Sequence, residues 1–440
     1  MNGAGWFPPA IRGATVSRSA RPRGTSWAWS PGSDPALKDE VILLGAHYDH
    51  VGYGRQNNSF GPWGYIHNGA DDNASGVAAV LEVIDAIQQL APPPRRSILF
   101  ALWDGEEQGL LGSRYWLARP TVPLARLRLA INLDMVGRMR GGQLEVYGIR
   151  TARGLRRIVS EANGEPAARL KFDWTLKADS DHWPFYERRV PILMFHTGLH
   201  GEYHRPSDDA HLINHDGLAS AARIAFHTIV RYADADELPP FREAVLQESP
   251  ATARWLEQPV STQQPRFGIP FRVAPGDPPK LVLTGITPGS PADKSGLRAG
   301  DELLELNGEP IRDEARLRLL LLAARGETTF LVQRPGVETP QLYKVTPLGE
   351  PIRVGVTWRM DDGEPGTAIV SQVIFGSAAQ LAGLAVGDRL YSIGGQPFRT
   401  QEELITLLTT AKSPLALEVE REGKIRTVEL QLVDLPPPAQ

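Results

Sequence analysis

One stretch of the sequence, residues 98–109 (ILFALWDGEEQG), restricts the possible folds of this chain most strongly. It begins with the apolar run 98–103, which is too short to span a membrane and is typical of a strand buried on both faces of a sheet. The run stops at Asp104, and two adjacent carboxylates follow, Glu106 and Glu107. Carboxylates beside a buried strand are costly unless a positive charge compensates them. Because adjacent side chains point in different directions, we interpret Glu107 as a metal ligand and Glu106 as a general base. The alternative is a solvated acidic turn at a helix start.

The composition narrows the chemistry of such a site. The 440 residues include no cysteine, so disulfides and cysteine nucleophiles are excluded and any metal is held by His, Asp and Glu. The net charge of -4 argues against nucleic acid as the main partner. No apolar run approaches the roughly 18 residues of a transmembrane helix. At about 150 residues per domain, the length predicts about three domains.

Further candidate ligands follow other apolar runs. The run 41–46 ends at His47, and Asp49 stands two residues later. A His with a nearby carboxylate at the end of a strand is typical of a metal ligand and the group that orients it. The alternative is a loop or capping histidine. Asp134 follows the predicted strand 129–133 in the same way.

Two more segments offer ligands of the same kind. Asp71 and Asp72 follow the polar loop 54–69 and precede a run with apolar residues at helical spacing. Aspartate at a helix start is an ordinary N-cap, but two in succession exceed what a cap needs. His204 lies in a polar segment after the predicted strand 190–195.

The order of elements predicts the fold class. Strands, polar loops and helices alternate up to a helix predicted over 216–232. This alternation predicts an α/β fold in which helices cover both faces of a sheet. In such sheets, ligands gather outside the carboxyl ends of the strands. The candidate ligands follow strands, so we expect them to form one site.

Six motifs, in their order and spacing, make this part of the chain resemble the M28 family of zinc aminopeptidases. The resemblance covers about residues 36–232 and implies the zinc exopeptidase fold, a mixed and mostly parallel sheet with helices on both faces. The motifs are GAHYDH (45–50), GADDNASG (69–76), DGEEQGLLGS (104–113), INLDMVG (131–137), SDHWPF (180–185) and EYHRPSD (202–208).

The resemblance implies a site for two zinc ions. Asp72 is expected to bridge them, and the Ala-Ser-Gly that follows favours it over Asp71. His47 and Asp134 complete one site, and Glu107 and His204 complete the other. Cobalt or manganese would suit the same donors. The implied ligands are His47, Asp72, Glu107, Asp134 and His204.

The resemblance also implies catalytic roles. Glu106 is the general base that acts on a water shared by the two zinc ions, and Tyr203 hydrogen-bonds the oxyanion. Asp49 is expected to orient His47, and the peptide bond after Asp72 is often cis in this family. The implied reaction is hydrolysis of the N-terminal peptide bond of a peptide or protein substrate.

Two other functions stay open. A glutaminyl-cyclase-like transferase uses one zinc ion, and retention of both His47 and Asp134 argues against it. A non-catalytic peptide-binding scaffold with a truncated peptidase half is the second, and the intact Glu106 argues against that. Family members usually carry a longer segment before GAHYDH, with early strands and often an export signal. If the sequence is complete, the sheet is expected to lack strands, which argues for the scaffold.

The second half of the chain repeats itself. Residues 289–301 (GSPADKSGLRAGD) are echoed by 376–388 (GSAAQLAGLAVGD), at an offset of 376 − 289 = 87. Both units resemble PDZ domains of the bacterial protease type, which bind extended peptides, often C-terminal ones, by adding a strand to a sheet edge. The expected peptide-binding loops contain Gly268 and Gly355. The alternative is that one or both units are packing modules with a blocked groove.

The predicted organisation has five segments. The first is rich in Arg, Gly, Pro and Ser, lacks the apolar core of a signal peptide and is expected to be irregular, so the localisation stays unassigned. The segments are an irregular N-terminal segment (1–35), an M28-like zinc peptidase domain (36–234), a polar linker (235–265) and two small β-rich PDZ-like domains (266–348 and 349–434).

Overall fold

The computed structural model describes residues 25–260, 265–276 and 279–434. The chain divides into two compact units. The first runs up to Ala253 and includes 362–365 and 422–425, and the second takes the rest of the chain from Arg254 onward.

A seven-stranded sheet forms the centre of the first unit, in the order β1-β3-β2-β4-β7-β5-β6. β1 pairs with β3, and β5 with β7, in antiparallel fashion, whereas the other four neighbouring pairs are parallel. The prediction of a mixed, mostly parallel sheet is therefore confirmed. The strands are β1 (Ser26–Ser30), β2 (Val41–His47), β3 (Ser97–Trp103), β4 (Leu127–Leu133), β5 (Gln143–Tyr147), β6 (Arg169–Asp173) and β7 (Ile192–His196).

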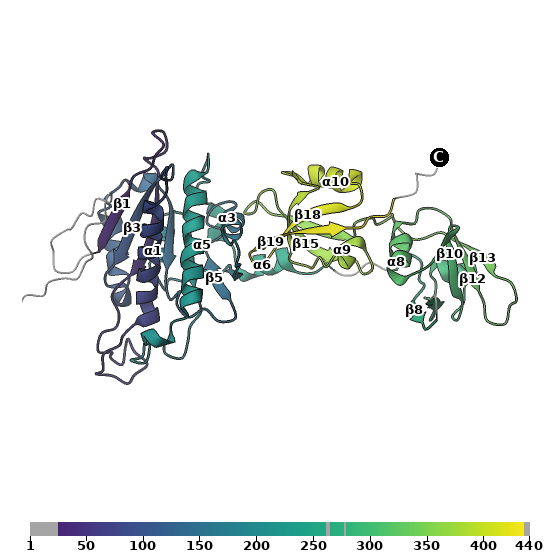
Figure 1. Ribbon diagram of the computed structural model, residues 1–440, viewed down its shortest axis with the longest axis horizontal. Coiled ribbons are helices and arrows are strands. Elements are labelled where there is room, and N and C mark those ends of the chain that lie inside the picture. Colours follow the sequence, from purple (N-terminus) through teal and green to yellow (C-terminus); the bar gives the residue numbers. More distant parts are fainter. Residues whose placement is uncertain (1–24, 261–264, 277–278, 435–440) are drawn as a thin grey trace, which may run out of the picture. The chain divides into compact units, whose positions relative to one another are not determined.

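Helices α1 (Gly76–Gln88) and α5 (His215–Asp234) cover one face of this sheet and lie side by side (Figure 1). Helix α3 (Leu155–Ala162) packs against α5. Ile42 and Leu44 of β2 belong to the apolar core beneath these helices. This face is stable because β2 is buried along its whole length, which removes apolar side chains from water.

The opposite face holds a second apolar core. Val41 and Leu43, which alternate with the residues of the first core, belong to it. Helices α2 (Leu111–Ala118) and α4 (His182–Glu187) supply its other wall. Successive side chains of a strand point to opposite faces, so an unbroken apolar run is required where both faces are covered. The predicted helices on both faces are confirmed.

The prediction that residues 1–35 are irregular is wrong at Ser26–Ser30, which form the edge strand β1. Its backbone pairs with β3 in antiparallel register, with Trp27 opposite Ala101. Trp27 and Trp29 pack against the second core. The sequence pattern did not predict this strand, because Gly, Pro and Arg residues flank it. Pairing with β3 and packing of the tryptophans stabilise it. The rest of the predicted segment up to residue 24 lies outside the described residues.

The predicted linker is more structured than its polar composition suggested. It contains a 3-10 turn (Glu243–Leu246) and helix α6 (Pro250–Glu257). Glu248 pairs with Arg150 at 2.5 Å and with Arg242 at 2.6 Å. Arg150 lies 98 residues from Glu248 in the sequence, so composition alone does not reveal this contact.

The second unit contains two six-stranded antiparallel sheets, one for each repeat. The first consists of β8 (Phe271–Ala274), β9 (Lys280–Leu283), β10 (Glu302–Leu306), β11 (Glu309–Pro310), β12 (Thr328–Gln333) and β13 (Gln341–Val345), with α7 (Pro291–Ser295) and α8 (Glu314–Ala323). The second consists of β14 (Val356–Met360), β15 (Ala368–Val373), β16 (Arg389–Ile393), β17 (Gln396–Pro397), β18 (Leu415–Arg421) and β19 (Lys424–Leu430), with α9 (Ala378–Leu381) and α10 (Gln401–Thr410).

The repeat in sequence is also a repeat in structure. Buried Asp301 accepts two hydrogen bonds from Arg334, and buried Asp388 accepts two from Arg421 at the equivalent place. The offset of 388 − 301 = 87 is the one seen in the glycine motifs. A buried carboxylate needs such a partner, so each repeat compensates its own charge internally.

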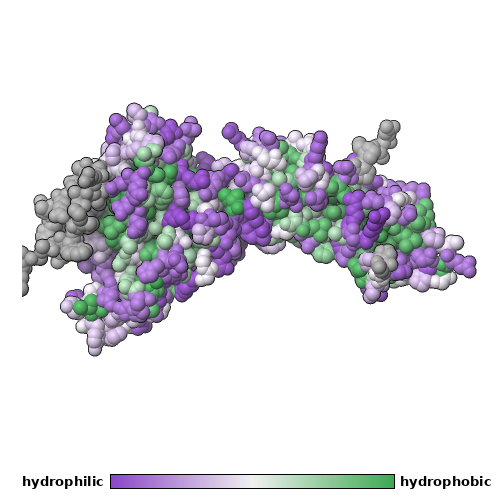
Figure 2. Space-filling model, viewed as in Figure 1, coloured by the Kyte–Doolittle hydropathy of each residue, from purple (hydrophilic) through white to green (hydrophobic). Residues whose placement is uncertain are grey.

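Within the described ranges, no helix is both long and apolar enough to cross a membrane. Figure 2 shows hydrophilic residues over most of the visible face, with smaller hydrophobic areas between them.

Candidate metal centre

The candidate site lies at the carboxyl edge of the first sheet. Strands β2 and β3 run parallel with His47 opposite Trp103, so the segments that follow both strands begin at one edge. His47 is the last residue of β2, and Asp134 directly follows β4. Glu107 lies in a short 3-10 turn after β3, and His204 in the loop after β7. The sheet therefore brings together ligands that are far apart in sequence.

The first donor cluster consists of His47, Asp72 and Asp134. The His47 Nε2 atom lies 3.3 Å from Asp72 Oδ1 and 3.4 Å from Asp134 Oδ1. All three residues are buried, with exposed fractions of 1%, 3% and 7%. We call this set the three-donor cluster.

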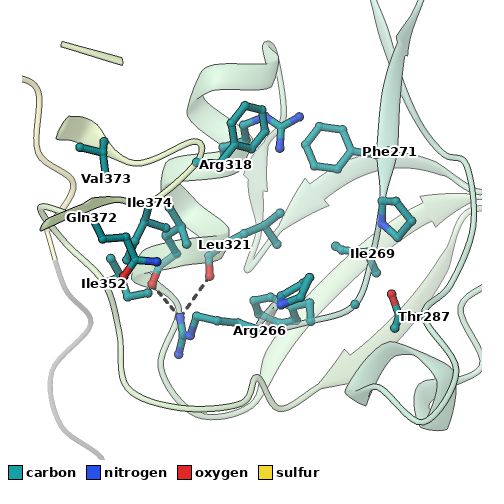
Figure 3. A pocket seen from close by; sticks show the side chains of 16 residues that line it. Arg266, Ile269, Phe271, Thr287, Arg318, Leu321, Ile352, Gln372, Val373 and Ile374 are labelled. Atoms are coloured by element: carbon teal, nitrogen blue, oxygen red, sulfur yellow. Dashed lines mark hydrogen bonds between the residues drawn. The ribbon is translucent and has the colours of Figure 1, made fainter. Parts of the chain in front are cut away.

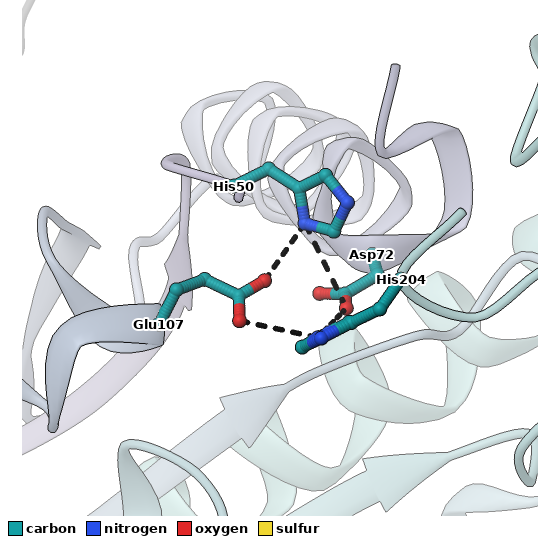
Figure 4. Close-up of side chains that lie close together, drawn as sticks. All are labelled: His50, Asp72, Glu107 and His204. Atoms are coloured by element: carbon teal, nitrogen blue, oxygen red, sulfur yellow. Dashed lines mark hydrogen bonds and ion pairs between the residues drawn. The ribbon is translucent and has the colours of Figure 1, made fainter. Parts of the chain in front are cut away.

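The second donor cluster consists of His50, Asp72, Glu107 and His204 (Figure 4). The His204 Nε2 atom lies 3.1 Å from Asp72 Oδ2 and 3.1 Å from Glu107 Oε2. The His50 Nδ1 atom lies 2.7 Å from Glu107 Oε1 and 3.8 Å from Asp72 Oδ2. We call this set the four-donor cluster. Asp72 directs one oxygen to each cluster.

The sequence analysis named the other five members of the two clusters as candidate ligands but gave His50 no role. Its only signal was a second His three residues after His47. Because β2 ends at His47, strand periodicity says nothing about the direction of the next side chains.

The two aspartates after the polar loop have different surroundings. Asp72 faces both clusters, whereas Asp71 accepts hydrogen bonds from the Gly137 amide at 2.6 Å and the Ser75 hydroxyl at 2.9 Å. The backbone amides of both aspartates donate to Asp208 Oδ2. The peptide bond between Asp72 and the next residue is cis, as expected. The geometry therefore favours Asp72 as the shared ligand.

Hydrogen bonds to backbone carbonyls fix both predicted imidazole ligands. His47 Nδ1 lies 3.1 Å from the Asp49 carbonyl oxygen, and His204 Nδ1 lies 2.9 Å from that of Asn58. A proton on each Nδ1 leaves Nε2 free to bind a cation. The Asp49 carboxylate was expected to orient His47, but it lies 3.8 Å away and instead accepts the Glu106 amide at 3.1 Å.

A serine orients the third buried ligand. The Ser180 hydroxyl donates to Asp134 Oδ2, and the Asn132 side-chain amide donates to that hydroxyl oxygen at 2.7 Å. These two residues leave Asp134 Oδ1 directed at His47. Partners of this kind hold a ligand in the orientation that binding requires.

The electrostatics of the clusters suit a cation. Although burial lowers it, hydrogen bonds with Asp72 and Glu107 raise the pKa of His204 to about 10. Burial also lowers the pKa of His47, but Asp134 and Asp72 raise it well above its ordinary value. Burial disfavours the charged form of Asp72, yet the two histidines hold its pKa well below the usual range. Positive charge is thus favoured at both positions, and a divalent cation supplies it without the protons.

The predicted catalytic residues lie beside the clusters. Burial, together with the charges of Asp134, Asp181 and Glu107, raises the pKa of Glu106 to about 10. The Tyr203 ring lies 3.9 Å from the His204 ring, centroid to centroid. Burial and the nearby carboxylates raise the pKa of the Tyr203 hydroxyl, which keeps it protonated at neutral pH.

The predicted peptide-binding loops lie in the second unit. Gly268 has φ +77 and Gly355 has φ +86. A Cβ at either position would approach within 2.2 or 2.1 Å of the Cβ of Ser290 or Ser377 respectively. Glycine is therefore required at both loops by backbone conformation and by space.

An apolar cavity of about 380 Å³ lies beside Gly268 (Figure 3). Ile269 and Leu321 are among the side chains that line it. The Arg266 guanidinium at its edge donates to the carbonyl oxygens of Leu321 at 3.2 Å and Leu322 at 2.6 Å. The charge of Arg266 is thus used within the domain, and the cavity favours an apolar group.

The fold and the clusters define an α/β domain with two groups of candidate metal ligands at one edge of its sheet. The sequence model of peptidase family M28 matches residues 28–229, and the PDZ domain model matches residues 282–334 and 369–421. Residues 28–229 therefore form a domain that matches peptidase family M28, and two matches to PDZ domains follow it.

Individual relatives match only part of the chain. Leupeptin-inactivating enzyme 1 of Streptomyces exfoliatus is 29% identical over 163 residues, which make up 37% of this chain and 33% of that relative. The chain thus spans about a third of the length of this curated relative.

Two solved structures are similar to this chain. A zinc aminopeptidase from Bacillus subtilis has a TM-score of 0.40 and 22% sequence identity. The match covers 50% of this chain and 53% of the Bacillus chain. An aminopeptidase from Aneurinibacillus sp. strain AM-1 has a TM-score of 0.41 and 26% identity and covers 49% of each chain.

Proposed function

We propose that the protein is a zinc-dependent aminopeptidase that uses two zinc ions to hydrolyse N-terminal peptide bonds. The observation that carries this proposal is the pair of donor clusters joined by Asp72, with Glu106 beside them. Paired metal sites about 3.5–4 Å apart are typical of aminopeptidases and need a shared acidic ligand. The match of residues 28–229 to peptidase family M28 supports a peptidase reaction.

The donor set fits zinc. Imidazole nitrogens and carboxylate oxygens are the ligands that zinc takes when thiolates are absent. In the proposal, His47 and Asp134 hold one ion, Glu107 and His204 the other, and Asp72 both. Bound zinc supplies a lowered water pKa, near about 7, and polarisation of a substrate carbonyl.

Glu106 acts as the general base in this proposal. It takes a proton from the attacking water and passes it to the leaving amine. Without metal, its raised pKa means that Glu106 holds a proton at neutral pH. Opposite charge within about 4–6 Å favours the ionised form of a carboxyl, so a cation at either cluster would lower the pKa of Glu106. The ionised form is the one that a general base requires.

Tyr203 stabilises the negative charge that develops on the substrate carbonyl oxygen. Its hydroxyl stays protonated because its pKa is raised by burial and the neighbouring carboxylates. A hydrogen bond that strengthens as the charge develops lowers the barrier. Stacking on His204 fixes the ring of Tyr203 beside the four-donor cluster.

We further propose that the first PDZ domain binds an extended peptide, presenting substrate or regulating access to the site. Strand β8 is the last strand of its sheet, and such an edge accepts an added strand. The cavity beside Gly268 suits an apolar peptide side chain, and Ile374 and Phe375 complete its lining. Changing Leu321 to Gln is expected to weaken binding of a fluorescent peptide with an apolar C-terminal residue. Changing the exposed Leu342 to Gln serves as the control.

A single substitution tests the proposed chemistry. Glu106→Gln removes the base while leaving every proposed ligand in place. Hydrolysis of an aminoacyl-nitroanilide panel is expected to fall by about 10²–10⁴, with metal content unchanged by elemental analysis. The exposed Glu237→Gln variant is the matched control and keeps full activity.

Three results contradict the proposal. Full activity in Glu106→Gln rules out Glu106 as the base. A folded wild-type protein that binds two metals and peptide but shows no turnover favours the scaffold alternative. A protein that binds one zinc ion and cyclises N-terminal glutamine favours the transferase alternative.

A further inference from the structure

His50 lies among the proposed metal ligands, although the five ligands implied by the resemblance do not include it. Its Nδ1 atom is 2.7 Å from Glu107 Oε1 and 3.8 Å from Asp72 Oδ2. Its side chain is only 10% exposed. Figure 4 shows the ring directed at the two carboxylates, opposite His204.

The spacing of the four donor atoms suits a single cation. Zinc–ligand distances of roughly 2.0–2.1 Å in a tetrahedron separate the donors by about 3.3 Å. The four nitrogen–oxygen separations given for this cluster run from 2.7 to 3.8 Å and lie on both sides of this value. A cation here can therefore meet all four side chains after small shifts.

The surroundings of His50 hold its ring in place. Its ring packs edge-on against the His204 ring, with centroids 5.5 Å apart and an interplanar angle of 83°. A Cβ at Gly69 would lie 2.8 Å from His50 Cγ and Cδ2, so a larger residue at 69 would displace the ring. Among the described atoms, His50 Nε2 is buried without a hydrogen-bond partner. The ring thus makes its polar contacts through Nδ1, on the side of the cluster.

We propose that His50 is a fourth protein ligand at the four-donor cluster, so that the two metal positions differ in strength. This inference rests on the proposed function, because it concerns the same metal site. The four-donor cluster binds its ion more tightly and fills first. The three-donor cluster binds its ion more weakly and keeps an additional coordination position open, as catalytic zinc sites do.

An alternative role is available to His50. Its Nδ1–H donates to Glu107 and only orients that carboxylate. Partners that orient a ligand typically contribute about 10–100-fold to metal affinity. Loss of a ligand is expected to cost more than this range. The size of the effect, and the response to a variant that keeps the hydrogen bond, separate the two roles.

The experiment is a titration of the metal-free full chain with cobalt(II). Calorimetry measures the affinities, and visible absorption records the cobalt spectrum. Wild type is expected to show two binding events of different affinity. In His50→Ala, the tighter event weakens by more than about 100-fold and its cobalt spectrum changes, while the weaker event keeps its affinity. His50→Asn, which keeps an N–H donor, behaves like His50→Ala. The exposed His227→Ala is the matched control and titrates like wild type.

Several outcomes overturn the inference. Unchanged affinities and an unchanged spectrum in His50→Ala overturn it. Recovery of wild-type binding in His50→Asn also overturns it, because that result assigns His50 to the orientation of Glu107. Binding is measured without turnover, so the expected titrations in a protein that hydrolyses nothing support His50 as a ligand and contradict the proposed aminopeptidase. A wild-type protein that binds no cobalt contradicts both.

Discussion

The two donor clusters share Asp72 but are constructed differently. The three-donor cluster takes His47 and Asp134 from the ends of neighbouring strands, and all its members are buried. The four-donor cluster takes its other members from loops and turns, and they are partly exposed. Strand register places the backbones of His47 and Asp134, whereas loops and turns place the other members of the four-donor cluster. The comparison indicates that donor number and rigidity are divided unequally between the two positions.

The largest effect is expected from the residue that the clusters share. Asp72→Asn removes a charged oxygen from both positions, so both metals are lost together. Activity is expected to fall by at least about 10³, since a metal contributes several kcal/mol and each 1.36 kcal/mol is about tenfold. Elemental analysis and nitroanilide hydrolysis measure this, with the exposed Asp216→Asn as control. Loss of one metal alone would contradict a shared ligand.

An intermediate effect is expected from pH. In the metal-free protein, the pKa of His204 is raised to about 10 and that of His47 also lies well above 6.5, so a cation at either cluster must displace a proton. Metal affinity at each cluster is therefore expected to rise about tenfold per pH unit around neutrality.

The stability of the metal-free protein follows the opposite trend. The raised pKa of His204 contributes stability that is fully present below about 6.5 and is lost as pH rises through about 10. Calorimetry of metal binding in buffers of different ionisation enthalpy measures the released protons, and thermal unfolding measures stability. Metal affinity that does not change between pH 6 and 8 would contradict the proposed protonation of the histidines.

The smallest effect is expected at a residue that supports only the three-donor cluster. Ser180→Ala removes the hydrogen bond to Asp134 and should weaken that position by about 10–100-fold, leaving the four-donor cluster unchanged. Cobalt titration measures each event. Ser160→Ala is a suitable control, since this buried hydroxyl has no hydrogen-bond partner among the described atoms. Equal weakening of both events would show that the clusters are not independent.

The sequence predicted the sheet and the neighbourhood of the ligands for a physical reason. Long apolar runs such as Val41–His47 and Ser97–Trp103 must be buried on both faces, and a parallel sheet brings the ends of such strands to one edge. A polar residue directly after such a run is therefore placed at that edge. His47 and Asp134 are predictable in this sense, and the spacing of the glycine motifs predicted the two repeats equally well.

The sequence by itself thus determined the buried strands, the edge at which the ligands gather and the repeat of the second half. Only the tertiary structure decided the edge strand Ser26–Ser30, the carbonyl of Asp49 as partner of His47, and the place of His50 in the four-donor cluster. These features depend on contacts between segments far apart in sequence, such as His204 Nδ1 with the Asn58 carbonyl, 146 residues away. Local periodicity fixes which face a side chain takes within a strand, but beyond the strand end its direction is set by the neighbours that it meets.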